Sequence, residues 1–235
     1  HAIFDAQTPW GSQYVKVSPS VRGFAPVLPY MIRMPKLSSL TQSRRADLNI
    51  PVDATVLCSY GGASSFNLKF VQQTVCEIAS EPHHDIFFLF ANHRTFCKHQ
   101  VARMTEGAAA VPRVIHLPNL KADERGAFLQ MCDAMLHARG EGETFGLAVG
   151  EFSLWNRPVF TYSKCRYRAH IEHLGTKALL YDDALSLRRM LFAFNRTGAA
   201  THDWRGYHQY TPAVVMGKFC RLCGGGGGMR GNVLN

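Results

Sequence analysis

Short apolar runs alternate with longer segments of helical periodicity between residues 54 and 194, and this alternation is the strongest constraint on the fold. The runs cover residues 54–59, 86–91, 114–117, 134–136, 159–162 and 178–181. Residues 66–80, between the first two runs, carry apolar side chains at spacings of three and four, which is typical of a helix with one buried face. Strands that alternate with helices of this length predict parallel βαβ units. We therefore predict an α/β fold with a Rossmann-like, doubly wound parallel sheet.

The composition changes along the chain and divides it into four predicted parts. Residues 1–40 contain repeated prolines and few periodic runs, so we interpret them as the remnant of an N-terminal domain followed by a linker. Residues 41–205 hold the alternating pattern and are predicted to form the Rossmann-like domain. Residues 206–223 are predicted to form a C-terminal helix that Pro212 interrupts early, and residues 224–235 a flexible glycine-rich tail. The chain begins without a methionine, which suggests a fragment of a longer protein.

The net charge of +9 limits the kinds of partner that the chain can have. A positive surface suits nucleic acid, a phosphate-rich small ligand or an anionic membrane. The basic residues are scattered, without a basic run interleaved with aromatic residues, so nucleic acid is the least favoured of these partners and a peripheral membrane contact stays open. No apolar run reaches the ~18–20 residues that a membrane-spanning helix needs, and no signal peptide is visible. We predict a cytoplasmic location, with membrane-peripheral as the alternative.

Seven cysteines are spread along the chain at irregular spacings. Four of them lie within apolar segments and are predicted to be reduced, buried thiols: Cys58, Cys76, Cys97 and Cys132. Cys220 and Cys223 form a single C-x-x-C pair, whereas a structural zinc site needs four ligands. We therefore predict no metal site.

The stretch from Met135 to Tyr162 carries two carboxylates, Glu143 and Glu151, eight positions apart around a glycine-containing turn. It has the order strand, loop, helix, strand, and in open α/β sheets the loops that follow strands bind ligands. If the helix starts near Thr144, its first N–H groups can bind an oxyanion. Eight helical residues turn through about 800°, which is about 80° beyond two full turns. Glu143 is therefore expected to act from the loop and Glu151 from the helix.

Each carboxylate also has a simpler interpretation. An acidic side chain just before a helix is often a surface residue that the helix dipole stabilises, and this could describe Glu143. Glu151 could lie on a solvated helix face. Spacing alone does not separate these interpretations from a binding site, so the neighbouring residues have to decide.

The string Glu143-Thr-Phe-Gly-Leu-Ala-Val-Gly-Glu151, followed by Asn156-Arg157-Pro158-Val159, resembles the E-x7-E signature of retaining GT-B glycosyltransferases of the group 1, or family 4, type. Residues 132–137 resemble the strand that precedes this motif, and Tyr60-Gly61-Gly62 resembles the glycine-rich phosphate loop of the same family. The resemblance covers residues 53–219. It implies the C-terminal, donor-binding half of a GT-B fold, with a truncated N-terminal domain.

The resemblance implies an enzyme that transfers a sugar from a nucleotide-sugar donor to a glycan, lipid or protein acceptor, with retention of configuration. It implies no cofactor and no essential metal ion. Glu143 would be the catalytic residue that contacts the transferred sugar, and Glu151 would hold the nucleotide ribose. The other predicted donor-binding residues are Thr144, Phe145, Gly146, Leu147, Gly61, Gly62, Lys69, Arg139 and Asn92.

Two features depart from the family pattern. Ser59 stands where the family commonly has an arginine aimed at the diphosphate, so positive charge is missing beside the leaving group. The resemblance also implies that residues 1–40 are only the last part of an acceptor-binding domain and the linker. A non-catalytic module that binds sugar nucleotides is therefore the alternative function, and a basic nucleic-acid-binding protein is a third, less favoured one.

Overall fold

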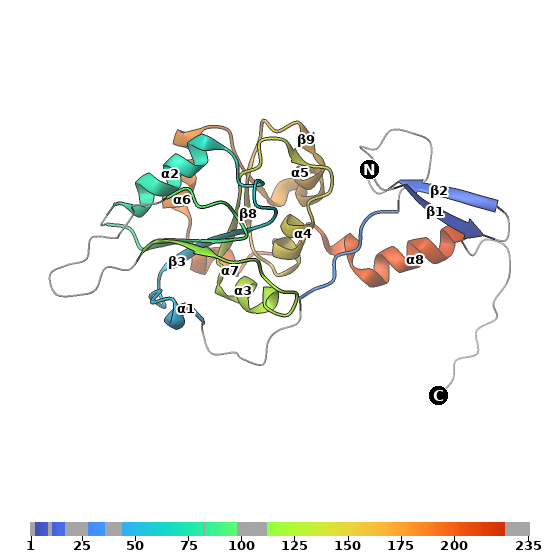
Figure 1. Ribbon diagram of the computed structural model, residues 1–235, viewed down its shortest axis with the longest axis horizontal. Coiled ribbons are helices and arrows are strands. Elements are labelled where there is room, and N and C mark those ends of the chain that lie inside the picture. Colours follow the sequence, from blue (N-terminus) through green and yellow to red (C-terminus); the bar gives the residue numbers. More distant parts are fainter. Residues whose placement is uncertain are drawn as a thin grey trace. The chain divides into compact units, whose positions relative to one another are not determined.

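The computed structural model of the protein describes residues 3–8, 11–16, 28–35, 44–81, 83–97 and 112–223. The chain divides into two compact units. The larger unit is Met34–His208, and the smaller unit combines His1–Arg33 with Gln209–Asn235. Figure 1 follows the chain from blue at the N-terminus to red at the C-terminus.

A six-stranded sheet forms the centre of the larger unit, and all its neighbouring strands are parallel. Its strands are β3 (Thr55–Tyr60), β4 (Ile86–Ala91), β5 (Val114–Leu117), β6 (Ala134–His137), β8 (Val159–Tyr162) and β10 (Ala178–Tyr181). Each of the predicted apolar runs forms one of these strands, and the predicted α/β, Rossmann-like fold is confirmed. The order across the sheet is β10-β8-β6-β3-β4-β5, so the chain runs outward from β3 to β5 and then returns to β6 on the other side of β3. Open α/β sheets bind ligands at such a reversal.

Helices cover both faces of this sheet (Figure 1). They are α1 (Arg44–Asp47), α2 (Lys69–Ala79), α3 (Arg125–Met131), α4 (Leu147–Leu154), α5 (Ala169–Leu174), α6 (Ala184–Ala193) and α7 (Arg196–Ala200). Successive side chains of a strand point to opposite faces. In β8, Phe160 packs on Phe194 at the end of α6, whereas Thr161 bonds to His170 of α5. None of the described helices is long and apolar enough to cross a membrane.

The main hydrophobic core lies between the sheet and the layer formed by α2 and α6. Its buried members include Leu57, Phe88, Phe90 and Leu136 from the strands, Val71, Val75 and Ile78 from α2, and Leu187 and Leu191 from α6. Burying such a side chain stabilises the fold by about 1.5–3 kcal/mol. This layer therefore fixes the strands whose carboxyl ends meet at the point where the strand order reverses.

Helix α2 begins at Lys69, three positions later than the sequence pattern predicts. The N-cap is Leu68, which makes no side-chain capping bond, and the Ser65 hydroxyl donates to the carbonyl of Gly62. Phe66 is buried in an aromatic stack instead of starting the helix. Packing of one aromatic ring thus outweighed the helical periodicity. By contrast, α6 has a side-chain cap, because Asp183 forms a capping box with Ser186.

The smaller unit contains a hairpin of β1 (Ile3–Thr8) and β2 (Gly11–Lys16) and the helix α8 (Pro212–Cys223). The hairpin was not expected in a region with so many prolines. Pro212 is the first residue of α8 and does not interrupt it, because its fixed φ suits the first helical turn. The predicted tail, residues 224–235, lies outside the described residues, and the assignment of residues 1–40 to a domain remnant stays a prediction.

The prediction of reduced thiols is wrong for four cysteines. Cys58 of β3 is bonded to Cys132, which follows α3, and Cys76 of α2 is bonded to Cys97, which follows β4. The Cα atoms of the pairs are 5.7 and 6.0 Å apart, within the usual range for disulfides. The pairs are 74 and 21 positions apart in the chain, so only the fold brings them together. Disulfides are rare in reducing compartments, so these two pairs give no support to the predicted cytoplasmic location.

Candidate donor-binding site

The loops after β3 and β6 lie side by side where the strand order reverses. The carbonyl of Ala138, just after β6, accepts hydrogen bonds from the N–H groups of Asn67 and Leu68 at 2.9 and 3.2 Å. The side chain of Asn67 accepts a further bond from the N–H of Gly140 at 2.8 Å. These contacts join the segment after β6 to the residues immediately before α2. The two loops that the sequence predicted to hold the donor are therefore in direct contact.

Glu143 is held in the loop by a short strand pair. It belongs to β7 (Gly142–Glu143), which pairs in parallel with β9 (Tyr167–Arg168). Gly142 has a φ of +72°, and a Cβ atom there would come within 2.1 Å of the carbonyl oxygen of Tyr167. Only glycine fits this position, and it lets Glu143 approach β9. Glu143 therefore acts from the loop, as the helix geometry predicts.

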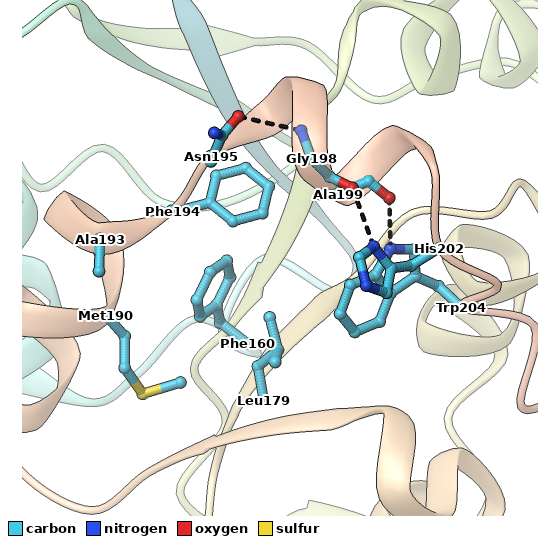
Figure 2. Close-up of a pocket in the computed structure, with 10 residues that line it drawn as sticks. All are labelled: Phe160, Leu179, Met190, Ala193, Phe194, Asn195, Gly198, Ala199, His202 and Trp204. Atoms are coloured by element: carbon cyan, nitrogen blue, oxygen red, sulfur yellow. Dashed lines mark hydrogen bonds between the residues drawn. The ribbon is translucent and has the colours of Figure 1, made fainter.

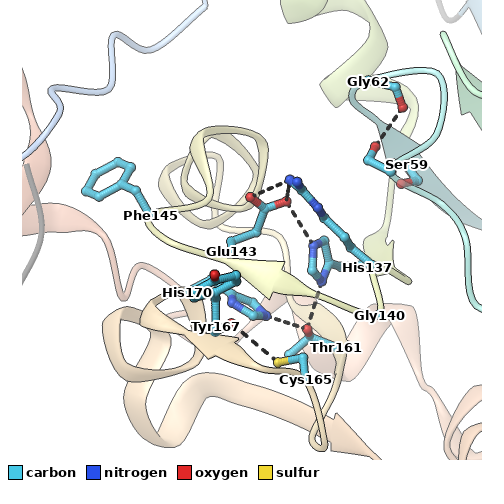
Figure 3. A network of polar contacts seen from close by, with 12 residues as sticks. Ser59, Gly62, His137, Gly140, Glu143, Phe145, Thr161, Cys165, Tyr167 and His170 are labelled. Carbon is cyan, nitrogen blue, oxygen red and sulfur yellow. Dashed lines mark hydrogen bonds and ion pairs between the residues drawn. The ribbon is translucent and has the colours of Figure 1, made fainter. Parts of the chain in front are cut away.

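The Glu143 carboxylate has two cationic or potentially cationic partners (Figure 3). The Nη1 atom of Arg139 lies 3.0 Å from each carboxylate oxygen, and the Nε2 atom of His137 lies 3.5 Å from Oε1. Burial acts to raise the pKa of Glu143, but the hydrogen bond with His137 and the charge of Arg139 outweigh it, so the pKa is lower than usual. Glu143 is therefore a charged, oriented carboxylate at neutral pH.

His137 belongs to a row of buried polar side chains that the sequence did not reveal. Its Nδ1 atom lies 2.9 Å from the hydroxyl of Thr161, which in turn lies 2.9 Å from Nε2 of His170 (Figure 3). The hydroxyl of Tyr181 donates to the backbone carbonyl of His137 at 2.7 Å. Burial lowers the pKa of His170 to about 3, so this imidazole is neutral. The row fixes the ring of His137 and, through it, Glu143.

The turn after Glu143 differs from the prediction. Helix α4 begins at Leu147, whereas a start near Thr144 was expected, because Gly146 at the N-cap has a φ of +83°. A Cβ atom on Gly146 would lie 3.0 Å from His170 and 3.2 Å from the hydroxyl of Tyr207, so a larger residue would also be tightly packed there. Of the predicted N–H donors, only that of Leu147 lies in the first helical turn.

The other predicted residues of this turn differ in solvent exposure. Phe145 is buried, and its carbonyl accepts a hydrogen bond from the hydroxyl of Tyr207 at 2.6 Å. Thr144 is exposed, and Leu147 is exposed at the start of α4. Phe145 therefore anchors the turn, while Thr144 and Leu147 face solvent.

Glu151 does not lie on a solvated helix face. Its side chain is only 12% exposed, its Oε2 atom accepts a hydrogen bond from the hydroxyl of Tyr60, and its Oε1 atom lies 3.3 Å from Nη1 of Arg125. Burial raises the pKa of Glu151 to about 7. The ring of Tyr60 packs against Phe128 and Phe152. Arg125, at the start of α3, carries no signal in the sequence that would pair it with Glu151.

The glycine loop after β3 is shaped by its neighbours. A Cβ atom on Gly61 would meet the hydroxyl of Ser65 at 2.6 Å, and the side-chain amide of Asn92 donates to the carbonyl of Gly61 at 2.7 Å. Gly62 is exposed, with open space where a Cβ atom would be. Lys69 is exposed at the first position of α2. Asn92 therefore holds this loop, while Gly62 and Lys69 are accessible to a ligand.

Ser59 brings no positive charge to this loop. Its buried hydroxyl lies 3.1 Å from Nε2 of His93, the first histidine after β4. Burial lowers the pKa of His93 to about 4, so the imidazole is neutral at physiological pH. His93 therefore does not supply the positive charge of the arginine that the family pattern has at the position of Ser59. No group of three or more His, Cys, Asp or Glu side chains that could hold a metal ion occurs within the described part of the chain.

A separate cavity of about 440 Å³ opens beside α6 and α7 (Figure 2). It is lined by Phe160, Leu179, Met190, Ala193, Phe194, Asn195, Gly198, Ala199, His202 and Trp204. Its polar groups are engaged within the lining: Asn195 accepts from the N–H of Gly198, and the indole N–H of Trp204 donates to Ala199. None of the predicted donor-binding residues lines this apolar cavity, so it is not the site of the charged motif.

Comparison with known proteins finds no matching protein-family model and no matching curated protein. Solved structures do match. HepE from Anabaena, solved in complex with UDP-glucose, has a TM-score of 0.58 at 11% identity, over 80% of this chain and 54% of that one. WaaG, a glycosyltransferase involved in lipopolysaccharide biosynthesis, has a TM-score of 0.56 at 17% identity, over 85% and 56%.

Sucrose-phosphate synthase from Thermosynechococcus elongatus gives a TM-score of 0.58 at 15% identity, over 88% of this chain and 54% of that one. The chain thus spans about half the length of the solved structures that it matches. At these identities the likeness concerns the fold and not the residues of the site. The chain has the α/β, Rossmann-like fold of GT-B glycosyltransferases, as the resemblance of its E-x7-E stretch predicts.

Proposed function

We propose that this chain carries the donor site of a retaining glycosyltransferase that uses a nucleotide sugar. The observation that carries the proposal is the arrangement of the two motif carboxylates. Glu143 is ionised and fixed in the loop by Arg139 and His137, while Glu151 is held apart from it by Tyr60 and Arg125. Both lie on segments that follow β6 at the reversal of the strand order. The structural neighbour HepE, solved with UDP-glucose, supports a nucleotide-sugar donor.

The proposed roles follow from charge and position. Glu143, as an acceptor of hydrogen bonds, would orient the hydroxyls of the transferred sugar, and Glu151 would bind the ribose of the nucleotide. Arg139 and Lys69 would supply positive charge to the diphosphate. The exposed Gly62 and the first N–H groups of α4 would complete its binding. Fixed charges of this kind stabilise a leaving diphosphate without reorganisation during the reaction.

We further propose that transfer needs no metal ion and no organic cofactor. The cationic side chains Arg139 and Lys69 would then neutralise the departing diphosphate, as a metal ion does in other reactions with a diphosphate leaving group. Turnover of donor in the presence of a chelator such as EDTA checks this point. A loss of activity that added magnesium restores would contradict it.

A thermal-shift titration with UDP, GDP and ADP and their glucose conjugates tests donor binding. At a ligand concentration of 100 times Kd, the stabilisation of roughly 2.7 kcal/mol corresponds to a rise in Tm of roughly 5–10 °C for a chain of this size. Glu151→Gln should abolish the rise, because the amide replaces one of the two acceptor oxygens by an NH2 donor, which cannot accept from a ribose hydroxyl. Glu172→Gln, an exposed glutamate of α5, is the matched control and should keep it. The absence of a shift with every nucleotide would refute the proposal.

A non-catalytic module that binds sugar nucleotides is the second candidate, and a specific observation favours it. Ser59 stands where the family pattern has an arginine, and the neutral His93 beside it does not supply the missing positive charge. Loss of such a charge would cost about 2–4 kcal/mol of transition-state stabilisation if nothing replaced it. Chromatography that detects sugar released from the bound donor distinguishes the two candidate functions. Detectable release or transfer would favour the enzyme, and tight binding without turnover would favour the module.

A further inference from the structure

The ion pair between Arg139 and Glu143 joins two residues that the proposed function assigns to different parts of the donor. The Nη1 atom of Arg139 lies 3.0 Å from both oxygens of Glu143. In this arrangement the guanidinium occupies lone pairs that Glu143 would offer to sugar hydroxyls. The carboxylate likewise occupies the Nη1 donors that Arg139 would offer to a diphosphate. In the free chain, each residue therefore engages part of the hydrogen-bonding capacity of the other.

The backbone of Arg139 is fixed beside the beginning of α2. The residue before it, Ala138, accepts hydrogen bonds from the N–H groups of Asn67 and Leu68, and the residue after it, Gly140, donates to Asn67. Helix α2 begins at Lys69, directly after Leu68. The start of an α-helix has unpaired N–H groups and a partial positive charge that attract anions. The backbone of Arg139 is therefore anchored close to the beginning of α2, a place where a phosphate group is favoured.

Burial indicates which partner is free to move. The side chain of Arg139 is 41% exposed, that of Glu143 is 21% exposed, and that of His137 is 8% exposed. Glu143 keeps a second partner in His137, whose ring is held by Thr161 and whose carbonyl is held by Tyr181. Arg139 has no such second restraint on its guanidinium among the contacts of the described residues. Arg139 can therefore turn away while Glu143 stays in place.

We propose that Arg139 is a displaceable clamp, which neutralises Glu143 in the free chain and turns to the diphosphate when a nucleoside diphosphate binds. This inference rests on the proposed function, since it requires a diphosphate at the end of the sheet. It makes binding of the nucleotide part the step that frees Glu143 for the sugar. Because coupling between two sites is reciprocal, weakening the pair between Arg139 and Glu143 must strengthen diphosphate binding.

A double-mutant cycle measures this coupling by isothermal titration calorimetry with UDP, GDP and ADP. An exposed ion pair stabilises by an amount equivalent to a factor of up to about five in binding, so Glu143→Gln should bind the diphosphate about two- to fivefold more tightly than the unmodified chain. Arg139→Gln should bind it more weakly. The double variant should match Arg139→Gln, because without the arginine there is no pair to release. The corresponding nucleoside monophosphates should show a smaller gain, since the β-phosphate is absent.

Glu141→Gln is the matched control, because Glu141 is exposed, lies two positions from Glu143 and loses the same charge. It should leave the affinity unchanged. Circular dichroism and the Tm of each variant verify folding. An unchanged or reduced affinity of Glu143→Gln, or an equal gain in the Arg139→Gln background, would overturn the clamp while leaving the proposed function intact. Failure of the unmodified chain to bind any of the three diphosphates would overturn both.

Discussion

The two carboxylates of the E-x7-E stretch lie in opposite electrostatic environments. Arg139 and His137 outweigh the effect of burial on Glu143, whose pKa lies below its usual value. Glu151 has Arg125 at a longer distance, and burial raises its pKa to about 7. Environments that separate the pKa values of two carboxyl groups commonly assign them different chemical roles. Glu143 thus suits a permanently charged contact, whereas Glu151 is close to its titration point.

The two regions also differ in how their partners are held. Glu151 bonds to Tyr60 at the end of β3 and to Arg125 at the start of α3, and the disulfide between Cys58 and Cys132 joins these two elements. Glu143 depends on non-covalent contacts alone: the ion pair with Arg139, and the hydrogen bond to His137 with the buried row behind it. A covalent link braces one carboxylate, and a polar network orients the other.

The largest expected effect comes from removing the covalent brace. The disulfide closes a loop between positions 74 apart, and loop-closure entropy of this size corresponds to about 4 kcal/mol of unfolding free energy. We expect the variant Cys58→Ala/Cys132→Ala to lose stability of this order in urea denaturation. Cys220→Ser, which removes an exposed free thiol, should change it little. A loss below 1 kcal/mol would show that the link does not brace the Glu151 region.

Exchange of each carboxylate for its amide should separate the two roles in catalysis. We expect Glu143→Gln to lower the kcat of donor turnover about 100-fold or more, as loss of one fixed electrostatic contact does in other enzymes. Glu151→Gln should act mainly by raising KM, because the role proposed for Glu151 is to hold the nucleotide and not the reacting sugar. Steady-state kinetics with a range of donor concentrations distinguish the two patterns. Equal losses of kcat in both variants would contradict the division of roles.

The buried row behind Glu143 should contribute to stability through its shared hydroxyl. Thr161→Val removes the hydroxyl that bridges His137 and His170. The Nδ1 atom of His137 and the Nε2 atom of His170 then lose this hydrogen-bond partner. We expect a loss of about 1–3 kcal/mol in the free energy of unfolding. Thr161→Ser keeps the hydroxyl and should recover most of the loss. If valine and serine behave alike in chemical denaturation, the row does not hold Glu143 in place.

The pH dependence of stability should differ in sign between the two carboxylates. The raised pKa of Glu151 means that the folded chain binds more protons than the unfolded chain between pH 4.5 and about 7, so stability falls as pH rises through this window. Because Arg125 and Tyr60 also favour the charged form, we expect a fall of only about 1–2 kcal/mol. Glu151→Gln should remove it.

Glu143, with its lowered pKa, adds stability that is present above pH 4.5 and lost as pH falls below it. Urea unfolding of both amide variants over pH 4 to 8 measures the two contributions separately. An unchanged slope between pH 5 and 7 in Glu151→Gln would mean that Glu151 is ionised throughout.

Prediction from sequence succeeded where local pattern and burial agree. Each apolar run became a parallel strand, and Glu143 and Glu151 lie on loop and helix as the spacing requires. The helix starts were less well predicted. Phe66 left the helical pattern to stack on Phe90 and Phe96, and Gly146 adopted a left-handed conformation that delayed α4. In both cases a tertiary contact or a backbone conformation outweighed periodicity.

The amino-acid sequence by itself determined the order of strands and helices, the loop position of Glu143 and the helical position of Glu151, because these depend on neighbours in the chain. Only the tertiary structure decided which groups meet. Tyr60 bonds to Glu151 across 91 positions, and Cys58 reaches Cys132 across 74. Burial and charge at a site are sums over such distant contacts. The low pKa of Glu143, the raised pKa of Glu151 and the pairing of Arg139 therefore follow from the fold and not from the motif.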